Sequence, residues 1–173
     1  MSHGAAHADP SDPFQMRVAV AMALITVVVA FNGMLTNQAR TEALLLSNEA
    51  TNQWAYFQAK STKAAIVRAT RDIVDQLPGR EGAAPAGTSD KLKAEAERYD
   101  REKEEIKVEA DKITAEGKHQ QHREHYFEYA TTIAEVALVL ASVALLMASK
   151  NVFRLSVAVA AAALVVTGYT ALH

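Results

Sequence analysis

The chain has 173 residues, of which 50% are hydrophobic and 22% are charged, and its formal net charge is −2. A balance this close to neutral provides no basic surface for nucleic-acid phosphates, and the absence of cysteine excludes disulfides and thiolate chemistry. The stretches 18–35, 133–148 and 155–172 hold a single charged side chain, Glu135, whereas 37–128 is dense in charged residues. This segregation predicts a membrane protein with a polar middle and argues against a soluble enzyme.

Three stretches have the length and apolarity of transmembrane helices, which need about 20 mostly apolar residues. We predict them at 16–35, 130–148 and 154–172, after a flexible N-terminal tail over 1–15. The first is expected to be an uncleaved signal anchor, because Asn37-Gln38-Ala39 is a poor cleavage site.

The basic residues predict an orientation in the membrane. Lys150 and Arg154 flank the short loop predicted at 149–153, and Arg17 precedes the first apolar stretch. Positive charges of short loops favour the cytoplasmic side. We therefore expect the N-terminus in the cytoplasm and the polar middle in the periplasm, with the chain in a bacterial inner membrane.

Small residues recur at alternating spacings of three and four in all three apolar stretches, which places them on one face of each helix. Such stripes predict close helix packing within or between subunits. The positions that we expect to pack are Ala23, Ala30, Gly33, Ala137, Ala141 and Ala144.

The polar middle, 36–129, is predicted to be a long antiparallel helical hairpin, which completes an all-α fold. Its arms are expected at 36–77 and 89–129, joined by the Pro- and Gly-rich loop 78–88, and Thr88 or Ser89 is expected to cap the second arm. Apolar residues recur with coiled-coil spacing along both arms. They are Leu46, Ala50, Phe57, Ala64, Val67 and Val74, and Leu92, Ala96, Tyr99, Ile106, Ala110 and Ile113.

Pairing the arms from the membrane outward is expected to bring Ile73 near Leu92 and Ile66 near Tyr99. The seam has few large residues, so a lone hairpin would be marginally stable. Association with copies of itself or with a larger membrane complex is therefore expected. The residues expected at that interface are Trp54, Tyr56, Phe57, Lys60, Tyr99 and Ile106.

The run Gln53-Trp54-Ala55-Tyr56-Phe57-Gln58-Ala59-Lys60-Ser61, between a first apolar stretch and a His-rich charged return arm, resembles the bacterial domain-of-unknown-function family four-three-three-seven. The resemblance covers nearly the whole chain after the first dozen residues. It implies a small multi-pass bacterial membrane protein and no reaction. Asn52 and the weakly basic loop 149–153 depart from the family pattern, which has Asp and a more basic loop there.

His119, His122 and His125 recur at three-residue steps beside several glutamates. Imidazoles one turn apart can share a metal ion, but a six-residue step turns His119 and His125 away from each other. The alternatives are a polar collar near the membrane, which we favour, a pH-responsive cluster, and a metal site. We expect no metal and no cofactor.

Glu135 lies about five residues inside the second apolar stretch, at nearly the depth of Asn32 in the first. Ionisable groups within a membrane are costly and are candidates for function. Glu135 could reach the interface, bond to Asn32 and Thr131 between helices, or line an ion path.

No phosphate loop, nucleophile elbow or zinc-hydrolase motif is present in the sequence. We therefore expect no enzyme and no catalytic residues. The expected function is that of an oligomerising scaffold or accessory subunit in the lipid bilayer that binds no nucleic acid. The alternative is an oligomeric ion or proton channel that uses Glu135.

Overall fold

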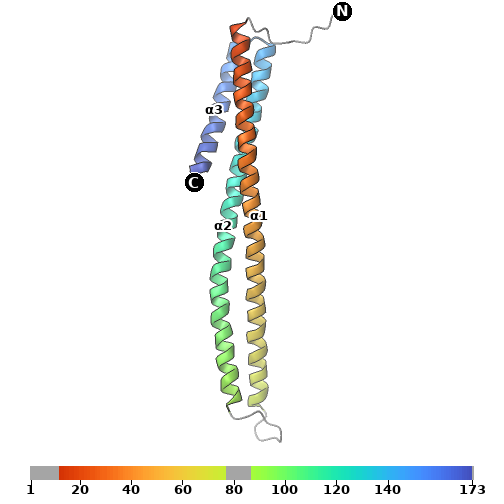
Figure 1. Ribbon diagram of the computed structural model, residues 1–173, viewed down its shortest axis with the longest axis vertical. Coiled ribbons are helices and arrows are strands. Elements are labelled where there is room, and N and C mark those ends of the chain that lie inside the picture. Colours follow the sequence, from red (N-terminus) through yellow and green to blue (C-terminus); the bar gives the residue numbers. More distant parts are fainter. Residues whose placement is uncertain (1–11, 77–86, 173) are drawn as a thin grey trace, which may run out of the picture. The chain divides into compact units, whose positions relative to one another are not determined.

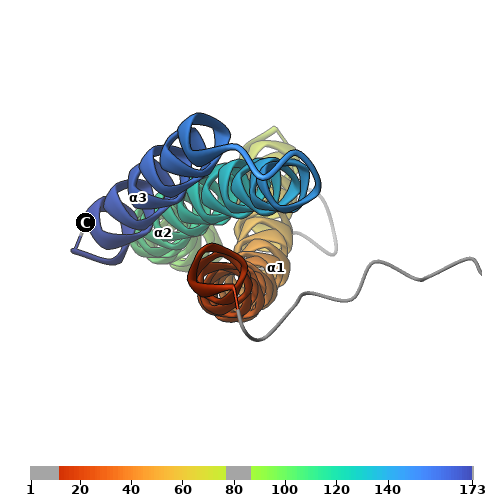
Figure 2. The ribbon, with the colours of Figure 1, turned by 90° about the horizontal axis from the view of Figure 1, so that it is seen from above.

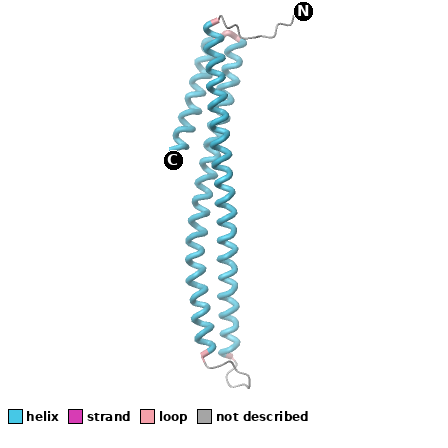
Figure 3. The backbone as a smooth tube through the Cα atoms, viewed as in Figure 1, coloured by secondary structure: helices cyan, strands magenta, loops and turns pink. Residues whose placement is uncertain are grey.

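A computed structural model describes residues 12–76 and 87–172 of the chain. Three helices account for almost all of these residues: α1 is Pro13–Asp75, α2 is Thr88–Leu146 and α3 is Lys150–Leu172 (Figure 1). The described part contains no strand (Figure 3), so the predicted all-α class is confirmed. Each helix includes a segment that is long and apolar enough to cross a membrane.

The chain divides into two compact units. The apolar unit comprises the residues up to Glu42 together with those from His119 onward, and the hairpin unit is Ala43–Lys118. Long continuous helices form because the described helical segments contain no proline after Pro13.

The helix ends differ by a few residues from the predicted boundaries. Asp12 caps α1, since its Oδ1 accepts a hydrogen bond from the Phe14 N–H at 2.8 Å, and Pro13 fills the first helical position. The predicted tail 1–15 therefore extends too far, while residues 1–11 lie outside the described residues. The predicted loop 78–88 also lies outside them, except for Gly87 and Thr88.

The connection between α2 and α3 is shorter than the predicted loop 149–153. Ala148 adopts a left-handed backbone conformation with φ 47°, and the Ser149 N–H donates to the Ala144 carbonyl at 3.1 Å. This is the hydrogen bond of a Schellman helix end, here with alanine where glycine is usual. It ends α2 at Leu146, two residues before the predicted limit, and lets α3 begin at Lys150.

The three helices of the apolar unit, seen from above in Figure 2, pack around a small core. Ile25 of α1, Ala134 and Ala137 of α2 and Ala163 of α3 form the centre of this core. The Ser156 hydroxyl donates to the Ala137 carbonyl at 2.8 Å, so α3 lies close against the backbone of α2. Small residues make this approach possible.

Within the chain, the small-residue stripe of α2 packs against its neighbours and that of α1 does not. Ala137, Ala141 and Ala144 are fully buried, whereas Ala23 and Ala30 are exposed within the chain. Gly33 is half-buried, and nothing lies within 4 Å of a Cβ added to it. The α1 face turned toward the other helices holds a buried series at seven-residue steps, and all of its members but Ala39 are larger than alanine. These buried residues are Val18, Ile25, Asn32 and Ala39.

The α1 face differs because its side chains fill the space beside the small side chains of α2. α2 presents alanines to the core, so the facing helix has to supply larger groups to reach native packing density. The α1 stripe therefore does not pack within the chain, and its packing between subunits stays a prediction.

Candidate interaction surface on the hairpin

The two arms of the hairpin unit pack through a thin seam of small side chains. Its most buried apolar residues are Ala43, Ala50, Ala64, Ala96, Ala110 and Ile113, of which only Ile113 is large. A Cβ added to Gly117 would lie 3.4 Å from Leu46 Cβ, so the arms approach closely there. The predicted seam residues are all buried or half-buried, yet the seam buries little apolar volume.

Charged residues between the arms hold the register of the seam. Lys60 of α1 pairs with Glu102 of α2, and Arg68 pairs with Asp100. Lys60 Nζ also lies 5.3 Å from the ring centroids of both Tyr56 and Tyr99. Lys60, predicted to be an interface residue, is therefore engaged within its own hairpin.

These ion pairs shift the pKa values of their members. The hydrogen bond from Lys60 lowers the pKa of Glu102, and the hydrogen bonds from Arg68 and Lys103 lower the pKa of Asp100. The hydrogen bond to Glu102 raises the pKa of Lys60. Each shift favours the charged form, so each pair stabilises the hairpin while both members are ionised.

We expect the stability of the protein to be lost at acid pH through these carboxylates. A lowered folded-state pKa contributes stability above the ordinary values of 3.8 for Asp100 and 4.5 for Glu102, and that contribution disappears as the pH falls through the lowered values. The midpoint temperature of thermal unfolding in detergent should therefore have a plateau near neutral pH and decrease below about pH 4. Lys60→Met should lower the plateau by a few degrees and flatten the acid decrease, whereas Lys93→Met on the exposed face should change neither. An equal effect of both variants would contradict this role of Lys60.

The aromatic residues predicted for an interface mostly pack within the chain. Trp54 and Phe57 form an edge-to-face pair with ring centroids 5.6 Å apart, and both are half-buried, as are Tyr99 and Ile106. Tyr56 is the exception, because half of its side chain is exposed. Five of the six predicted interface residues thus belong to the hairpin's own seam.

Ile66 and Ile73, predicted to face Tyr99 and Leu92, point outward and are 59% and 60% exposed. Their neighbours Val67 and Val74 occupy the seam instead. The predicted contacts of the two isoleucines are therefore wrong by one helical position.

The two isoleucines belong to an exposed face of α1 that carries one charge, Asp72 near its end, and that we call the neutral face. Its uncharged members recur every three to four residues along the outside of the arm, and all are exposed. They are Leu44, Leu45, Asn48, Thr51, Asn52, Ala55, Gln58, Ala59, Thr62, Ala65, Ile66, Ala69 and Ile73.

The outer surface of the other arm has the opposite character. Of the seventeen exposed residues in Thr88–Lys118, fourteen are charged, and the others are Ala94, Val108 and Ala115. In Ala43–Gln76 five of twenty-two exposed residues are charged. Outward positions of a solvated helical hairpin are ordinarily polar, so the neutral face has the composition of a surface that is covered by another helix.

The two intramembrane candidates are separate in the structure. Asn32 is fully buried, and its Oδ1 accepts a hydrogen bond from the Thr167 hydroxyl at 3.0 Å. Glu135 is exposed on the chain, and the Thr131 hydroxyl donates instead to the Phe127 carbonyl. The predicted alternative in which Glu135 bonds to Asn32 and Thr131 is therefore wrong.

The histidines do not form a site in the described part of the chain. His119, His122 and His125 are all exposed, and His125 Nδ1 lies 3.9 Å from a Glu128 oxygen. Within residues 12–76 and 87–172, no three His, Asp or Glu side chains gather in a way that could hold a metal ion.

The fold and the neutral face define a class of protein: three helices with membrane-spanning length and apolarity, two of which extend into a helical hairpin with one exposed face that carries almost no charge. The sequence model described as "Domain of unknown function (DUF4337)" matches residues 14–173, and the chain belongs to this family. No curated protein and no solved structure matches the chain.

Proposed function

We propose that the protein is a non-enzymatic membrane scaffold in which the neutral face of α1 joins two copies of the chain. The observation that carries this proposal is the near-absence of charge, with Asp72 alone, from an exposed, heptad-spaced face next to a densely charged arm. A hairpin whose own seam is mostly alanine gains stability when a second copy covers its apolar outer residues.

A second copy fits the neutral face because the face is compatible with itself. Two chains inserted in one membrane in the same direction have parallel α1 helices, so each residue of the face meets its own counterpart. The face brings only Asp72 near its own counterpart in that arrangement, whereas the charged arm would bring many like charges together. Self-association is therefore favoured over binding of a strongly charged partner.

Asn52 gives the pairing a defined register. It lies in the seven-residue series Leu45, Asn52, Ala59, Ile66 and Ile73, which takes the inward positions of a coiled coil when two copies meet. A single asparagine at such a position specifies the register and favours a dimer, because the two amides hydrogen-bond to each other.

The proposed location is a bacterial inner membrane, with the N-terminus in the cytoplasm and the hairpin in the periplasm. Arg17, Lys150 and Arg154 line one hollow of the apolar unit, near the edge-to-face pair of Phe14 and Phe153. This cluster of positive charge at one end of the apolar helices supports that orientation.

The channel alternative rests on Glu135, which is exposed on an apolar stretch of α2. A conducting ring requires carboxylates from several copies around one axis, whereas the neutral face favours two copies. We therefore place the channel second.

Oxidative crosslinking of single cysteines tests the scaffold proposal without background, because the chain contains no cysteine. Ala59→Cys, at the middle of the neutral face, should form a disulfide-linked dimer in intact membranes. Ala115→Cys, equally exposed on the charged arm, should stay monomeric. Failure of Ala59→Cys to crosslink while Ala115→Cys does so would reject the proposal, and a mixed disulfide with another protein would reassign the face to a heterologous partner.

A further inference from the structure

Three basic side chains gather at one end of the apolar unit, where α1 and α3 begin. Arg17 of α1 and Lys150 and Arg154 of α3 line a hollow of about 600 Å³. Phe14 and Phe153 form an edge-to-face pair with ring centroids 5.9 Å apart, which holds the two helix starts beside each other. Arg17 lies three residues after Phe14, and Lys150 lies three residues before Phe153, so these charges share a helix face with the ring pair.

These three cations have no carboxylate partner within residues 12–76 and 87–172. No ion pair there involves Arg17, Lys150 or Arg154, whereas cations of the hairpin pair with acidic residues across its seam. Asp12 also lines the hollow, but its Oδ1 accepts the hydrogen bond from the Phe14 N–H. Three positive groups and one negative group leave a net charge of +2 around the hollow, so an anion that enters it is attracted.

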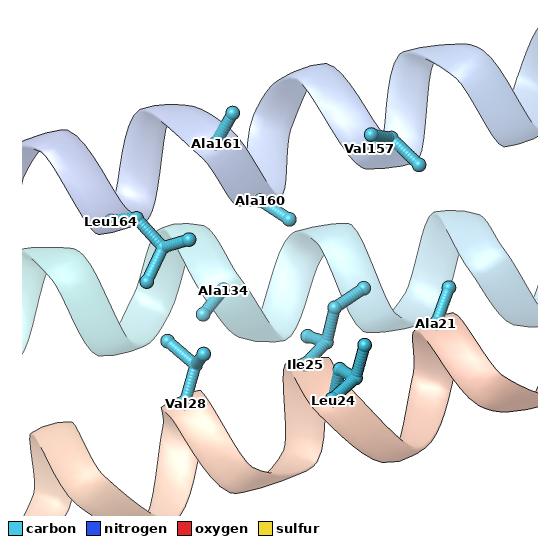
Figure 4. Close-up of a pocket in the computed structure, with 9 residues that line it drawn as sticks. All are labelled: Ala21, Leu24, Ile25, Val28, Ala134, Val157, Ala160, Ala161 and Leu164. Carbon is cyan, nitrogen blue, oxygen red and sulfur yellow. The ribbon is translucent and has the colours of Figure 1, made fainter.

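The basic hollow is followed by an apolar one in the direction in which α1 and α3 run. This second hollow has a volume of about 230 Å³, and Figure 4 shows that its lining side chains are all apolar. Ala21 and Val157 form its nearer end, four residues after Arg17 and three residues after Arg154. These steps correspond to about 5–6 Å along the helix axes. A ligand that fills both hollows therefore has an anionic group joined to a hydrocarbon chain.

The basic residues also lie at the level at which the apolar segments begin. Arg17 directly precedes the apolar stretch 18–35, and Arg154 directly precedes 155–172. In a membrane, the headgroups lie just outside the hydrocarbon core that such stretches span. The guanidinium groups are therefore at the depth of the phosphates of one leaflet.

We propose that this end of the apolar unit binds an anionic phospholipid, whose phosphate contacts Arg17, Lys150 and Arg154 while one acyl chain lies in the apolar hollow. The proposal rests on the membrane location given under the proposed function. Guanidinium groups form paired hydrogen bonds with phosphate oxygens, and lysine adds a point charge. Basic pockets between transmembrane helices are typical binding sites for anionic headgroups. A zwitterionic lipid is disfavoured, because its ammonium group brings a further positive charge to the three cations.

Native mass spectrometry of the full-length protein in detergent tests the site with two lipids that share dioleoyl chains, phosphatidylglycerol and phosphatidylcholine. The wild type should bind phosphatidylglycerol about tenfold more tightly than phosphatidylcholine. The double variant Arg17→Gln/Arg154→Gln should lose this preference. Arg17→Lys/Arg154→Lys, which conserves both charges, should keep it.

The matched control is Lys112→Gln/Lys118→Gln, which removes the same charge from exposed positions outside the hollow and should keep the wild-type preference. Circular dichroism verifies that each variant stays helical. Glycerophosphoglycerol, the headgroup without acyl chains, separates a lipid from a soluble phosphate ligand. An excess of it should leave phosphatidylglycerol bound, because it cannot occupy the apolar hollow.

Equal binding of the two lipids by the wild type, or an unchanged preference in Arg17→Gln/Arg154→Gln, would overturn the proposed site. An equal loss of preference in Lys112→Gln/Lys118→Gln would overturn it too, since total charge would then decide binding. Displacement of the lipid by glycerophosphoglycerol would reassign the basic hollow to a soluble phosphate and reject the lipid. Extraction of the wild type from membranes by alkaline carbonate would instead contradict the membrane location, so the two failures are distinguishable.

Discussion

Replacing Ala59 by glutamate should convert the associated protein into monomers. Ala59 is exposed near the middle of the neutral face, and in a parallel pair the two introduced carboxylates would meet across the interface. Burying like charges without a partner costs several kcal/mol, so the association constant should fall at least 100-fold. Förster transfer between labelled copies in liposomes measures this loss directly.

Two controls separate this effect from general damage to the helix. Ala115→Glu makes the same change on the charged arm, where the carboxylate stays solvated, and should leave energy transfer unchanged. Mixing the Ala59→Glu variant with Ala59→Lys should restore transfer between them, since opposite charges then face each other. Persistent transfer in Ala59→Glu alone, or no recovery in the mixture, would place the interface elsewhere.

Replacing Phe127 by alanine should cause the largest loss of stability of any single truncation in the apolar unit. Phe127 is 1% exposed and is the largest fully buried side chain in the described part of the chain. It lies with Leu35, Ala39 and Arg123, whose guanidinium carbon is 5.8 Å from its ring centroid. A cavity of this size costs about 3–5 kcal/mol.

Unfolding by titration with a denaturing detergent measures the effect, and Tyr129→Ala provides the matched control. Tyr129 is an aromatic residue two positions along the same helix but is 60% exposed, so its truncation leaves no cavity. Comparable destabilisation by the two variants would show that Phe127 does not anchor the packing of α1 against α2.

The hairpin can be predicted from sequence because its seam follows one simple period. Leu92, Tyr99, Ile106 and Ile113 recur every seven residues, and the structure places all four in the seam. The same period correctly places Val67 and Val74 in the seam. The wrong contacts of Ile66 and Ile73 come from pairing the two arms by distance from the membrane, which gives the level of a residue along the hairpin but not the side of the helix on which it lies.

The packing face of α1 in the apolar unit cannot be predicted from the positions of small residues. Small residues are frequent in all three apolar stretches, so the stripe through Ala23 and Ala30 is not informative. The seven-residue series of the first arm, continued backward from Leu46, leads to Ala39, Asn32 and Ile25, which are the residues that the structure buries. Asn32 and Glu135 lie at similar depths in their apolar stretches, and the sequence therefore suggests that they could meet. In the structure the helices are oriented so that Asn32 instead accepts a hydrogen bond from Thr167.

The neutral face cannot be recognised from the hydrophobicity of the sequence. Its uncharged members are mostly small or weakly polar, and only four of the thirteen are large and apolar. Sorting exposed positions by charge reveals the face, but that sorting requires knowing which positions the other arm covers. The hydrogen bonds that the Asn32 amide makes also depend on side-chain geometry, which the sequence does not contain.

The mass of the assembly tests the central claim most directly. Native mass spectrometry of the tagged protein, gently extracted from its own membranes, should give a species of twice the 18.7 kDa chain mass, with bound lipid removable by activation. The Ala59→Glu variant should give the mass of one chain. A wild-type chain that is monomeric at every concentration, or that is recovered only with other subunits, would contradict self-association through the neutral face.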